Sequence, residues 1–453
     1  MWSSTEFSVA LSEIHGRNVS SLIRAAGLVC ERVGFSFSKA LGNTFRQAVA
    51  GIFAKKEMNT DKMLQGHVQA TVARCRASAS QVLAVSQDTT YYNLHSHHHL
   101  SGLGLIHSRL RGTLQHNALA MDGAGTPLGL VYQRNWTRGG AGALARESDK
   151  WEEGLKAVNA ALGGIGKPVV LVQDREADVF AFFCAKRSSN VELVVRVCQP
   201  RRIEVAENGE VLPLHQAAEL LTEQGETEVQ VRRKNRPVRL RLQVKAGEVA
   251  VLPPKGTGQQ RARGLQLVVA REIAATDEQG NDAFDAGQAA CWLLLTTCQV
   301  QDAAAAFQVV AWYALRWRIE QLHYVLKSGG LKVEKLQFDD VHTFFNALAF
   351  YSVVAWRVLC LTYRVRQEPQ APVEEYLEPV EVKLLQASSQ KPVRTLQEAV
   401  LALGRLVNFH KTRKQPLPGA KLLAEALVKL HYMVAGWKLF EQQQNNTNFF
   451  LQD

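Results

Sequence analysis

Residues 302–330 read DAAAAFQVVAWYALRWRIEQLHYVLKSGG, and this stretch carries the strongest helix prediction in the chain. Asp302 can cap the first turn, and the alanines that follow it have the highest intrinsic helix propensity. The Gly329-Gly330 pair marks the expected end, because glycine readily adopts the backbone conformation that terminates a helix. The sequence therefore predicts one continuous helix over this stretch.

The predicted helix carries polar and apolar residues on opposite sides. At about 100° per residue, four polar residues fall within a stripe roughly 60° wide. These residues are Tyr313, Arg316, Glu320 and Lys327. The apolar residues opposite them are Leu315, Ile319, Leu322, Val325 and Leu326. The polar face is either a solvated surface or an ordered set of one carboxylate, two cations and a phenol, and the rest of the chain bears on that choice.

The composition is that of a globular protein with an excess of positive charge. The chain has 453 residues, of which 46% are hydrophobic and 21% are charged. Its formal net charge of +11 and isoelectric point near 9.3 suggest a polyanionic partner. The seven cysteines are odd in number and form no CxxC pair, which argues for reduced thiols and against a zinc module. Without an apolar leader or an apolar run long enough to span a bilayer, we expect no membrane association and a cytoplasmic location.

The residue pattern divides the chain into five parts. Residues 1–78 have helical spacing and carry ten Lys and Arg against five acids, as either a DNA-binding module or a solvated helical domain would. Residues 79–189 alternate strands with a helix, residues 190–290 are β-rich, and residues 291–365 return to strand and helix. Residues 366–453 are predicted to be a connector followed by helix. The fold class is therefore α/β, a core interrupted by a β-rich insertion and flanked by helical N- and C-terminal domains.

The last of these parts has two recognisable features. A Pro- and Glu-rich stretch over residues 366–382 is expected to be an exposed connector. A final helix is expected to begin near Pro418-Gly419, with an apolar stripe that suits packing or self-association. The stripe contains Leu423, Leu427, Leu430, Val434 and Trp437.

Three carboxylates are candidates for metal-dependent chemistry. Asp88 and Asp174 follow apolar strand-like runs, and Glu320 lies on the polar stripe of the predicted helix. Convergent carboxylates repel one another unless a hard cation lies among them. Two such ions can activate a water or a 3′-OH and stabilise the leaving oxygen of a phosphodiester. Each aspartate alone would more often be a turn or cap residue, so the prediction rests on all three together.

At these residues the chain resembles a known family. The four polar residues of the stripe have the spacing Tyr-x2-Arg-x3-Glu-x6-Lys, which is similar to the signature of bacterial cut-and-paste DDE transposases of the IS-four/Tn-five group. RWRIEQLH at 316–323 resembles that family's third-acid helix, QDTT at 87–90 its first-acid strand and QDREAD at 173–178 its second-acid block. Tyr324 departs from the pattern, because close relatives carry a second lysine there.

The resemblance implies an RNase H-like catalytic core, a helical N-terminal domain that binds transposon ends, and a C-terminal helical region used for dimerisation. Asp88, Asp174 and Glu320 would bind two Mg²⁺ ions, with Mn²⁺ as a substitute. The protein would cut transposon ends through a DNA hairpin and join them to target DNA. The implied partners are double-stranded DNA and a second copy of the chain, at the nucleoid in a bacterial cytoplasm.

The resemblance also implies DNA contacts. Tyr313, Arg316 and Lys327 would hold the phosphate near the cut, and Arg196, in VVRVCQPR, resembles a family arginine that contacts the transposon end. Trp292 lies in a block similar to the family's WLLLT strand and would stack on a flipped base, because hairpin closure requires a nucleotide to leave the stack. A core tryptophan is equally consistent with the sequence.

A basic segment of the insertion is a second candidate DNA contact. Residues 229–245 include seven basic residues and no acid, and the last part alternates apolar and cationic side chains as a strand with one cationic face would. Contact with phosphates would make DNA binding steeply salt-dependent, whereas a solvated face would not. The predicted contacts are Arg232, Arg233, Lys234, Arg236, Arg239 and Arg241.

Other interpretations stay open. His95, His97, His98 and His99 could bind a transition metal, although a solvated loop is favoured over that site. The chain could also be a DNA-binding relative without catalysis, or an RNase H-like nuclease that cuts DNA without strand transfer. The presence of all three acids argues against a catalytically silent protein, and joining of a pre-cut end to target DNA separates a transposase from a nuclease.

Overall fold

A computed structural model describes residues 2–7, 16–32, 35–233, 236–412 and 416–449. Lys234 therefore lies outside the described residues, and so does the side chain of Arg236. The strands are β1 (Leu83–Asn93), β2 (Gly104–His107), β3 (Leu110–Asp122), β4 (Pro127–Trp136), β5 (Val169–Gln173), β6 (Val191–Arg196), β7 (Arg202–Val205), β8 (Val211–Pro213), β9 (Thr222–Arg233), β10 (Arg236–Val251), β11 (Ala262–Asp277) and β12 (Cys291–Thr296). The helices are α1 (Trp2–Phe7), α2 (Gly16–Glu31), α3 (Phe37–Leu41), α4 (Asn43–Phe53), α5 (Thr60–Ala77), α6 (Asp149–Leu162), α7 (Phe180–Phe183), α8 (Leu214–Leu220), α9 (Ala303–Leu315), α10 (Trp317–Lys327), α11 (Val341–Gln367), α12 (Pro379–Ser389), α13 (Leu396–Leu406) and α14 (Ala420–Phe449), with short 3-10 turns that include η1 (Arg175–Ala177).

All twelve strands belong to one mixed sheet. Its order is β2-β3-β1-β5-β6-β12-β11-β10-β7-β8, with β4 paired to β3 and β9 paired to β10. β1, β5 and β6 run parallel, whereas the pairs β1–β3, β3–β4 and β6–β12 are antiparallel. All five residues of β5 are buried, as the continuous apolar run Val169–Gln173 predicts for a strand covered on both faces. The predicted α/β class with flanking helices is confirmed at this level.

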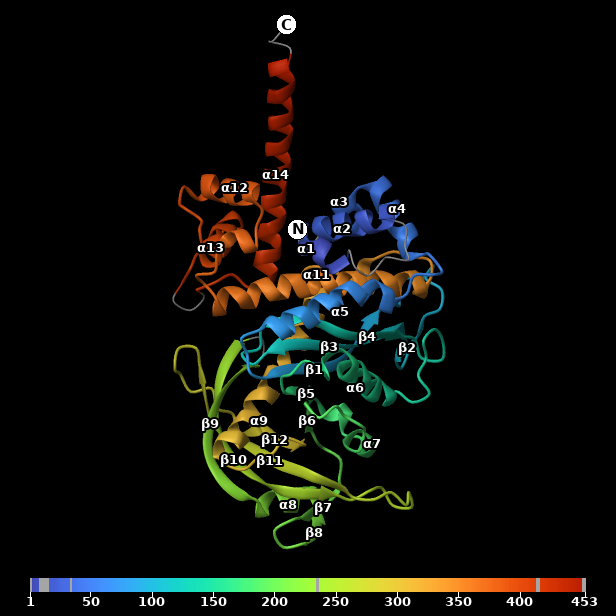
Figure 1. Cartoon of the computed structure of the whole chain (residues 1–453), viewed down its shortest axis with the longest axis vertical. Coiled ribbons are helices and arrows are strands. Elements are labelled where there is room, and N and C mark those ends of the chain that lie inside the picture. Colours follow the sequence, from blue (N-terminus) through green and yellow to red (C-terminus); the bar gives the residue numbers. More distant parts are fainter. Residues whose placement is uncertain (1, 8–15, 33–34, 234–235, 413–415, 450–453) are drawn as a thin grey trace.

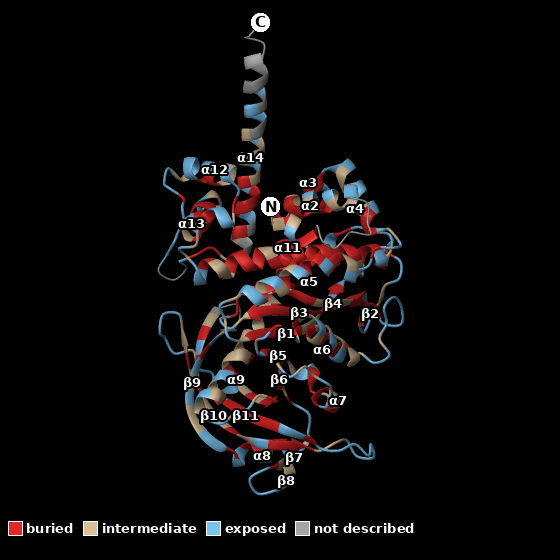
Figure 2. Cartoon of the chain, in the orientation of Figure 1, coloured by how far each residue is buried: buried red, intermediate tan, exposed pale blue. Residues whose placement is uncertain are grey.

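α11 lies between the sheet and the helices of the two chain ends. Figure 1 shows it crossing the molecule above β3 and β4 and below α2 and α14, and Figure 2 shows it as an almost wholly buried element. It is long and apolar enough to cross a membrane, but 94% of its most apolar window is buried inside the protein. Its hydrophobic character is therefore explained by packing in the core.

The N-terminal helices share a core with α11 and the sheet. Phe7 and Phe53 each pack on Phe350 of α11 with ring centroids 5.5 Å apart. α5 lies against β4 at Gly129, where a Cβ would meet the Thr71 side chain and where the backbone φ of 151° favours glycine. The described residues up to 78 are thus mainly helical, as predicted, and their helices α1 to α5 are packed on the rest of the chain.

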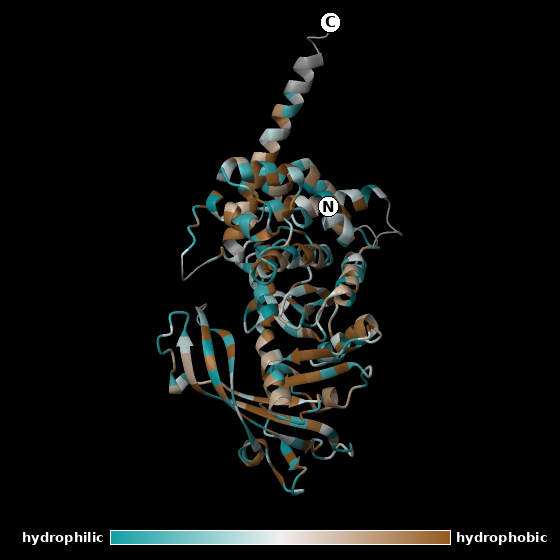
Figure 3. Cartoon of the chain, turned by 60° about the vertical axis from the view of Figure 1, so that its left-hand side comes forward, coloured by the Kyte–Doolittle hydropathy of each residue, from teal (hydrophilic) through white to brown (hydrophobic). Residues whose placement is uncertain are grey.

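The β-rich part forms the lower half of the molecule. β7 to β11 lie in residues 190–290, and β12 returns the chain beside β6. Figure 3 shows apolar and polar bands along these strands, and the middle of β11 is buried on both faces. One face rests on α9, through residues such as Leu240, Leu242, Val309 and Val310, and the other packs with α8.

Two predictions about helices need correction. The helix expected over residues 302–330 is two helices, because the Arg316 N–H bonds to the Tyr313 carbonyl and the Ile319 N–H bonds to the Arg316 carbonyl, each only three residues back. The exposed connector over residues 366–382 is wrong in its second half. Val373 and Val382 are buried in a cluster with α13 and α14, a cluster that also holds the first part of the α14 apolar stripe.

Candidate active site

Asp88 and Asp174 lie at the same level on neighbouring parallel strands. Ser86 of β1 pairs with Val172 of β5, and each aspartate is two residues further along its strand direction. Because side chains alternate with a period of two, the register directs both aspartates to the same side of the sheet. Asp174 follows the last residue of β5 and caps η1, its Oδ1 accepting from the Glu176 N–H at 2.9 Å. The sheet thus brings together two acids that are far apart in sequence.

Glu320 and Arg316 come to these aspartates from the start of α10. The Arg316 guanidinium binds Glu320 through Nη2, and its Nη1 lies 3.9 Å from Asp88 Oδ2. Only 16% of each of the Asp88 and Arg316 side chains is exposed, and 29% of Glu320. Arg316 therefore lies between two of the three predicted acids and partly neutralises them.

The electrostatics show that the three acids sense one another. Burial raises the pKa of Asp88 to about 7; Asp174 and Glu320 raise it as well, while Arg316 opposes them. Burial also raises the pKa of Glu320, with Arg316 opposing and Asp174 adding to the rise. Although burial disfavours its charge, Arg316 has a raised pKa because of Glu320 and other neighbouring groups that include Asp88. One guanidinium is too little positive charge for this group of carboxylates.

A series of buried polar side chains lies beside Asp88. His323 Nδ1 lies 3.8 Å from Asp88 Oδ2, and burial lowers the pKa of His323 to about 3, so the ring is neutral. His323 Nε2 lies 3.0 Å from Asn117 Nδ2, and Asn117 Nδ2 also donates to Gln115 Oε1 at 3.0 Å. Tyr92 donates its hydroxyl to the same Gln115 oxygen at 2.7 Å. These donors make His323 Nε2 an acceptor and leave the ring proton on Nδ1, facing Asp88.

Sequence reasoning did not assign His323 or Asn117 to the site. His323 lies within the RWRIEQLH block, three residues after Glu320, so helical spacing puts it on the same side of α10. That spacing was the available signal. Asn117 is opposite Asp88 in the β1–β3 register and could be found only from the strand pairing.

Three of the predicted DNA contacts are partly or fully buried, so they present little surface to a phosphate or a base. They are Lys327, Tyr313 and Trp292. Lys327 Nζ donates to Thr90 Oγ1 at 3.3 Å and lies 4.5 Å from the centre of the Tyr91 ring, and burial lowers its pKa. Tyr313 is 5% exposed and packs edge-to-face on Trp292, with ring centres 5.0 Å apart. Trp292 is itself 8% exposed, so its ring has little surface available to a base.

The basic residues of the insertion mostly meet acids on the neighbouring strand. Arg239 lies 3.6 Å from Glu228 and Arg241 lies 3.4 Å from Glu226, both pairs being exposed. The expected cationic face of β10 is therefore not uniformly cationic, because β9 supplies carboxylates that the local sequence window did not contain. Those carboxylates precede residue 229, where that window began.

Arg233 and Arg196 also bind groups of their own chain. Arg233 forms two hydrogen bonds with Glu272, whose side chain is completely buried, through Nη1 at 2.8 Å and also through Nη2. Arg196 Nη2 donates to the Cys291 carbonyl at 3.3 Å. Arg232, by contrast, is exposed. Within the segment, Arg233 has a structural ion pair and Arg232 is available to an outside anion.

The carboxylates suit a hard divalent cation in their chemistry. Carboxylate oxygens are the ligands that Mg²⁺ prefers, and burial raises the pKa values of Asp88 and Glu320, with neighbouring acids adding to the rise. Within the described part of the chain, however, no three His, Cys, Asp or Glu side chains are grouped to hold an ion as they stand. Since Arg316 binds Glu320, we infer that Arg316 must release it before that carboxylate can become a metal ligand.

The histidine run and the hollows lie apart from this chemistry. Of the four histidines, only His97 is buried, and its Nε2 lies 2.8 Å from the Glu334 carbonyl, while the other three are exposed.

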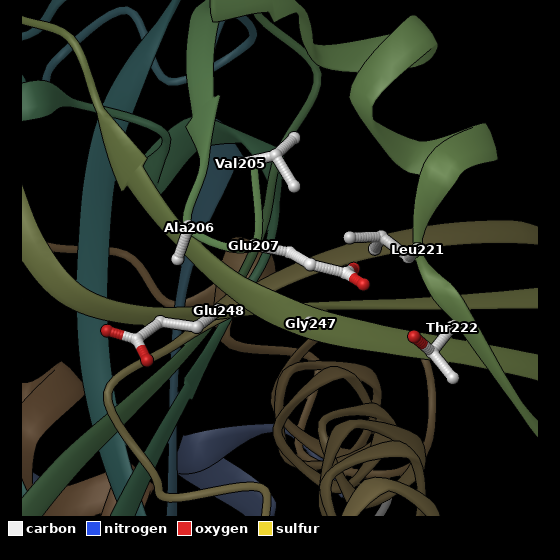
Figure 4. A pocket seen from close by; sticks show the side chains of 7 residues that line it. All are labelled: Val205, Ala206, Glu207, Leu221, Thr222, Gly247 and Glu248. Carbon is white, nitrogen blue, oxygen red and sulfur yellow. The ribbon is translucent and has the colours of Figure 1, made fainter. Parts of the chain in front are cut away.

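A cavity of about 330 Å³ lies between β7, β10 and the end of α8, lined by Glu207, Leu221 and Glu248 among others (Figure 4). None of the predicted site residues lines it. All seven cysteines are free, in agreement with the predicted reduced thiols.

Comparison with known proteins finds weak structural likeness. No protein-family model matches the chain. Among solved structures, it is similar to a piggyBac transposase synaptic complex with hairpin DNA, at 9% sequence identity and a TM-score of 0.36. The match covers 95% of this chain and 81% of that chain. The assignment of function therefore depends on the residues and geometry of the site.

Proposed function

We propose that the chain is a DNA transposase of the DDE type. The observation that carries this proposal is the level alignment of Asp88 and Asp174 on parallel strands, with Glu320 and Arg316 of α10 beside them. The proposal is supported by the raised pKa values of Asp88, to which Asp174 and Glu320 contribute, and of Glu320, to which Asp174 contributes. The separation of these acids in sequence makes a chance cluster of surface acids a poor explanation.

Asp88, Asp174 and Glu320 would hold two Mg²⁺ ions, for which Mn²⁺ can substitute. Bound ions of this kind activate a water or 3′-OH and stabilise the leaving oxygen of a phosphodiester. Arg316, once free of Glu320, would bind the phosphate near the cut through its guanidinium, with Lys327 supplying a second cation. Neutral His323 would hold Asp88 in position through its Nδ1–H.

The rest of the proposal follows from the resemblance of the sequence to the transposases of the IS-four/Tn-five group. The protein would bind paired transposon ends as a homodimer, cut them through a DNA hairpin and join them to target DNA in the cytoplasm. Since Leu423 and Leu430 of α14 are buried against the protein's own core, self-association would use the exposed end of the helix. That end carries Leu439 and Phe440 and projects away from the molecule (Figure 1).

One observation favours a second candidate function, a DNA-binding relative that does not cut. Arg316 binds Glu320 directly, and the described residues include no group of three ligands set to hold an ion. Such a protein would shift DNA in a gel and leave it intact in Mg²⁺ and in Mn²⁺. The two candidates therefore differ in a product that can be seen directly.

The test is a cleavage and joining assay with a duplex that carries the inverted repeats flanking the gene. We expect nicked, hairpin and strand-transfer products from the wild type with Mg²⁺, and none from Glu320→Gln, which keeps the size of the side chain and loses its charge. Glu375→Gln, at an exposed glutamate, is the matched control and should cut like the wild type. Binding without products from every protein would favour the non-cutting relative, and nicks without joined products would favour a nuclease.

A further inference from the structure

Arg318 is held in a fixed position outside the carboxylate group. Its guanidinium carbon lies 4.3 Å from the centre of the Tyr363 ring, and its Nη1 donates to the Tyr363 hydroxyl at 3.1 Å. Its Nε donates to the Gly125 carbonyl at 3.2 Å. The Tyr363 hydroxyl in turn donates to Gln321 Oε1. A guanidinium has about five N–H donors in all, and these contacts use two of them.

Arg366 lies on the same aromatic ring. Its guanidinium carbon is 5.7 Å from the centre of the Tyr363 ring, and its Nη1 donates to the Thr362 carbonyl. Although the residue as a whole is exposed, its guanidinium folds back on α11, and this burial lowers its pKa. Arg318 and Arg366 thus lie on the same Tyr363 ring, and both Arg232 and Arg318 lower the pKa of Arg366 further.

These three arginines come from separate elements. Arg318 is on α10, Arg366 at the C-terminal end of α11, and Arg232 near the end of β9. Figure 1 shows the edge of the sheet formed by β9 and β10 curving up toward that end of α11. Among the described residues, none of the three has a carboxylate partner within 4.0 Å, although Arg364 on the same helix binds Glu368. Folding thus assembles cations that repel one another and leaves them without a neutralising acid.

We propose that Arg232, Arg318 and Arg366 form a binding site for a phosphate of the DNA backbone, separate from the carboxylate site. Guanidiniums bind phosphate oxygens through paired N–H donors, and an arginine already stacked on an aromatic ring loses little further freedom on binding. A phosphate placed among the three would relieve their mutual repulsion. This proposal rests on the proposed function for the identity of the ligand as DNA. The site would position duplex between the β9–β10 edge and α11.

The experiment measures DNA binding in the Glu320→Gln background, so that no cleavage is needed. The affinity for a fluorescein-labelled duplex is followed by anisotropy across a salt series, in the parent, in Arg232→Gln/Arg366→Gln and in Arg364→Gln. Each phosphate contact removed should reduce the slope of log affinity against log salt by about 0.9. Because the site binds one phosphate, we expect the double variant to lose about 0.9 from the slope, whereas Arg364→Gln, at the paired arginine, keeps the parent slope.

The outcomes separate this site from the proposed function. Equal slopes in the double variant and the parent would overturn the site, while cleavage by the wild-type protein would leave the transposase proposal standing. A reduced slope in the double variant, without any cleavage by the wild type, would support the site and contradict the transposase proposal. If inorganic phosphate at constant ionic strength abolishes the difference between the parent and the double variant, free phosphate competes with DNA for this site, as the proposal expects. Both exchanged side chains are exposed, and a melting curve for each variant shows that folding is kept.

Discussion

Arg316 and Arg318 are two residues apart at the start of α10, and they have opposite surroundings. Arg316 meets Glu320 and Asp88 and is 16% exposed. Arg318 stacks on Tyr363, bonds to a carbonyl and a hydroxyl, and has no carboxylate within 4.0 Å among the described residues. Residues two apart on a helix point in different directions, so their neighbours come from different elements.

This difference shows that the groups already bound to an arginine decide which further ligands that arginine can bind. Arg316 is already committed to carboxylates, so it can hold a phosphate only when Glu320 is given another partner. Arg318 keeps N–H donors that are free for an anion from outside. Arg239 and Arg241 of β10 resemble Arg316 in this respect, because Glu228 and Glu226 face them from β9.

Replacement of Arg316 should give the largest effect. Arg316→Gln removes the cation proposed to bind the scissile phosphate, and loss of one such electrostatic contact lowers a rate by about 10²–10³-fold. The measurement is the single-turnover rate of end cleavage at saturating DNA and Mg²⁺. Arg146→Gln is the control, because Arg146 is 81% exposed and pairs only with Asp149 in its own turn. A rate within a few-fold of that control would show that Arg316 has only a charge-balancing role.

The pH dependence of stability tests the same carboxylate group without DNA. The pKa of Asp88 rises from 3.8 to about 7 on folding, chiefly by burial. Between these values the folded protein keeps a proton that the unfolded chain has lost, so this contribution to stability is complete below the lower value and disappears as the pH rises through the higher one. The free energy of unfolding of Asp88→Asn, taken relative to that of the wild type, should therefore increase by roughly 2 kcal/mol between pH 5 and pH 7.5, with EDTA present.

Chemical denaturation at the two pH values gives this difference. Glu375→Gln, at an exposed glutamate, should show no such gain and controls for the loss of one acid. If Asp88→Asn differs from the wild type by the same amount at both pH values, Asp88 is ionised in the folded protein throughout the range. Asp88 would then be less buried in solution than the structure indicates.

The sequence predicted what depends on local pattern. The buried strand β5, the long core helix α11 and the apolar face of α10 all follow from period and composition. The strand expected to end before Asp88 instead continues past it, because β1 runs from Leu83 to Asn93 in pairing with β3. The break at Arg316 did not follow, because the residues on either side have good helix propensity and the change in hydrogen bonding is a tertiary effect. The carboxylates could be proposed from motif spacing, but the Arg316 contacts that join two of them could not.

Features built from strand pairing were beyond sequence reasoning. Asn117 stands beside Asp88 only through the β1–β3 register, and Glu272 meets Arg233 from a different strand. The proposed site of Arg232, Arg318 and Arg366 joins residues of β9, α10 and α11, which are not adjacent in the sequence. A charge count in a sequence window reports the side chains of one strand and omits the acids or cations that face it.

The smallest effect is expected from the strand that looks most basic. Arg239→Gln/Arg241→Gln should change the salt slope of DNA binding by less than about 0.5. Both guanidiniums pair with acids of β9, and although such exposed ion pairs are weak, they occupy the two guanidiniums part of the time. The matched comparison is Arg232→Gln/Arg366→Gln, which removes the same charge. Glu226→Gln/Glu228→Gln should act in the opposite direction and steepen the slope, since it frees both arginines. If Arg239→Gln/Arg241→Gln instead flattens the slope as much as the other arginine pair, DNA displaces the β9 acids, and pairing in the free protein does not decide which arginines bind phosphate.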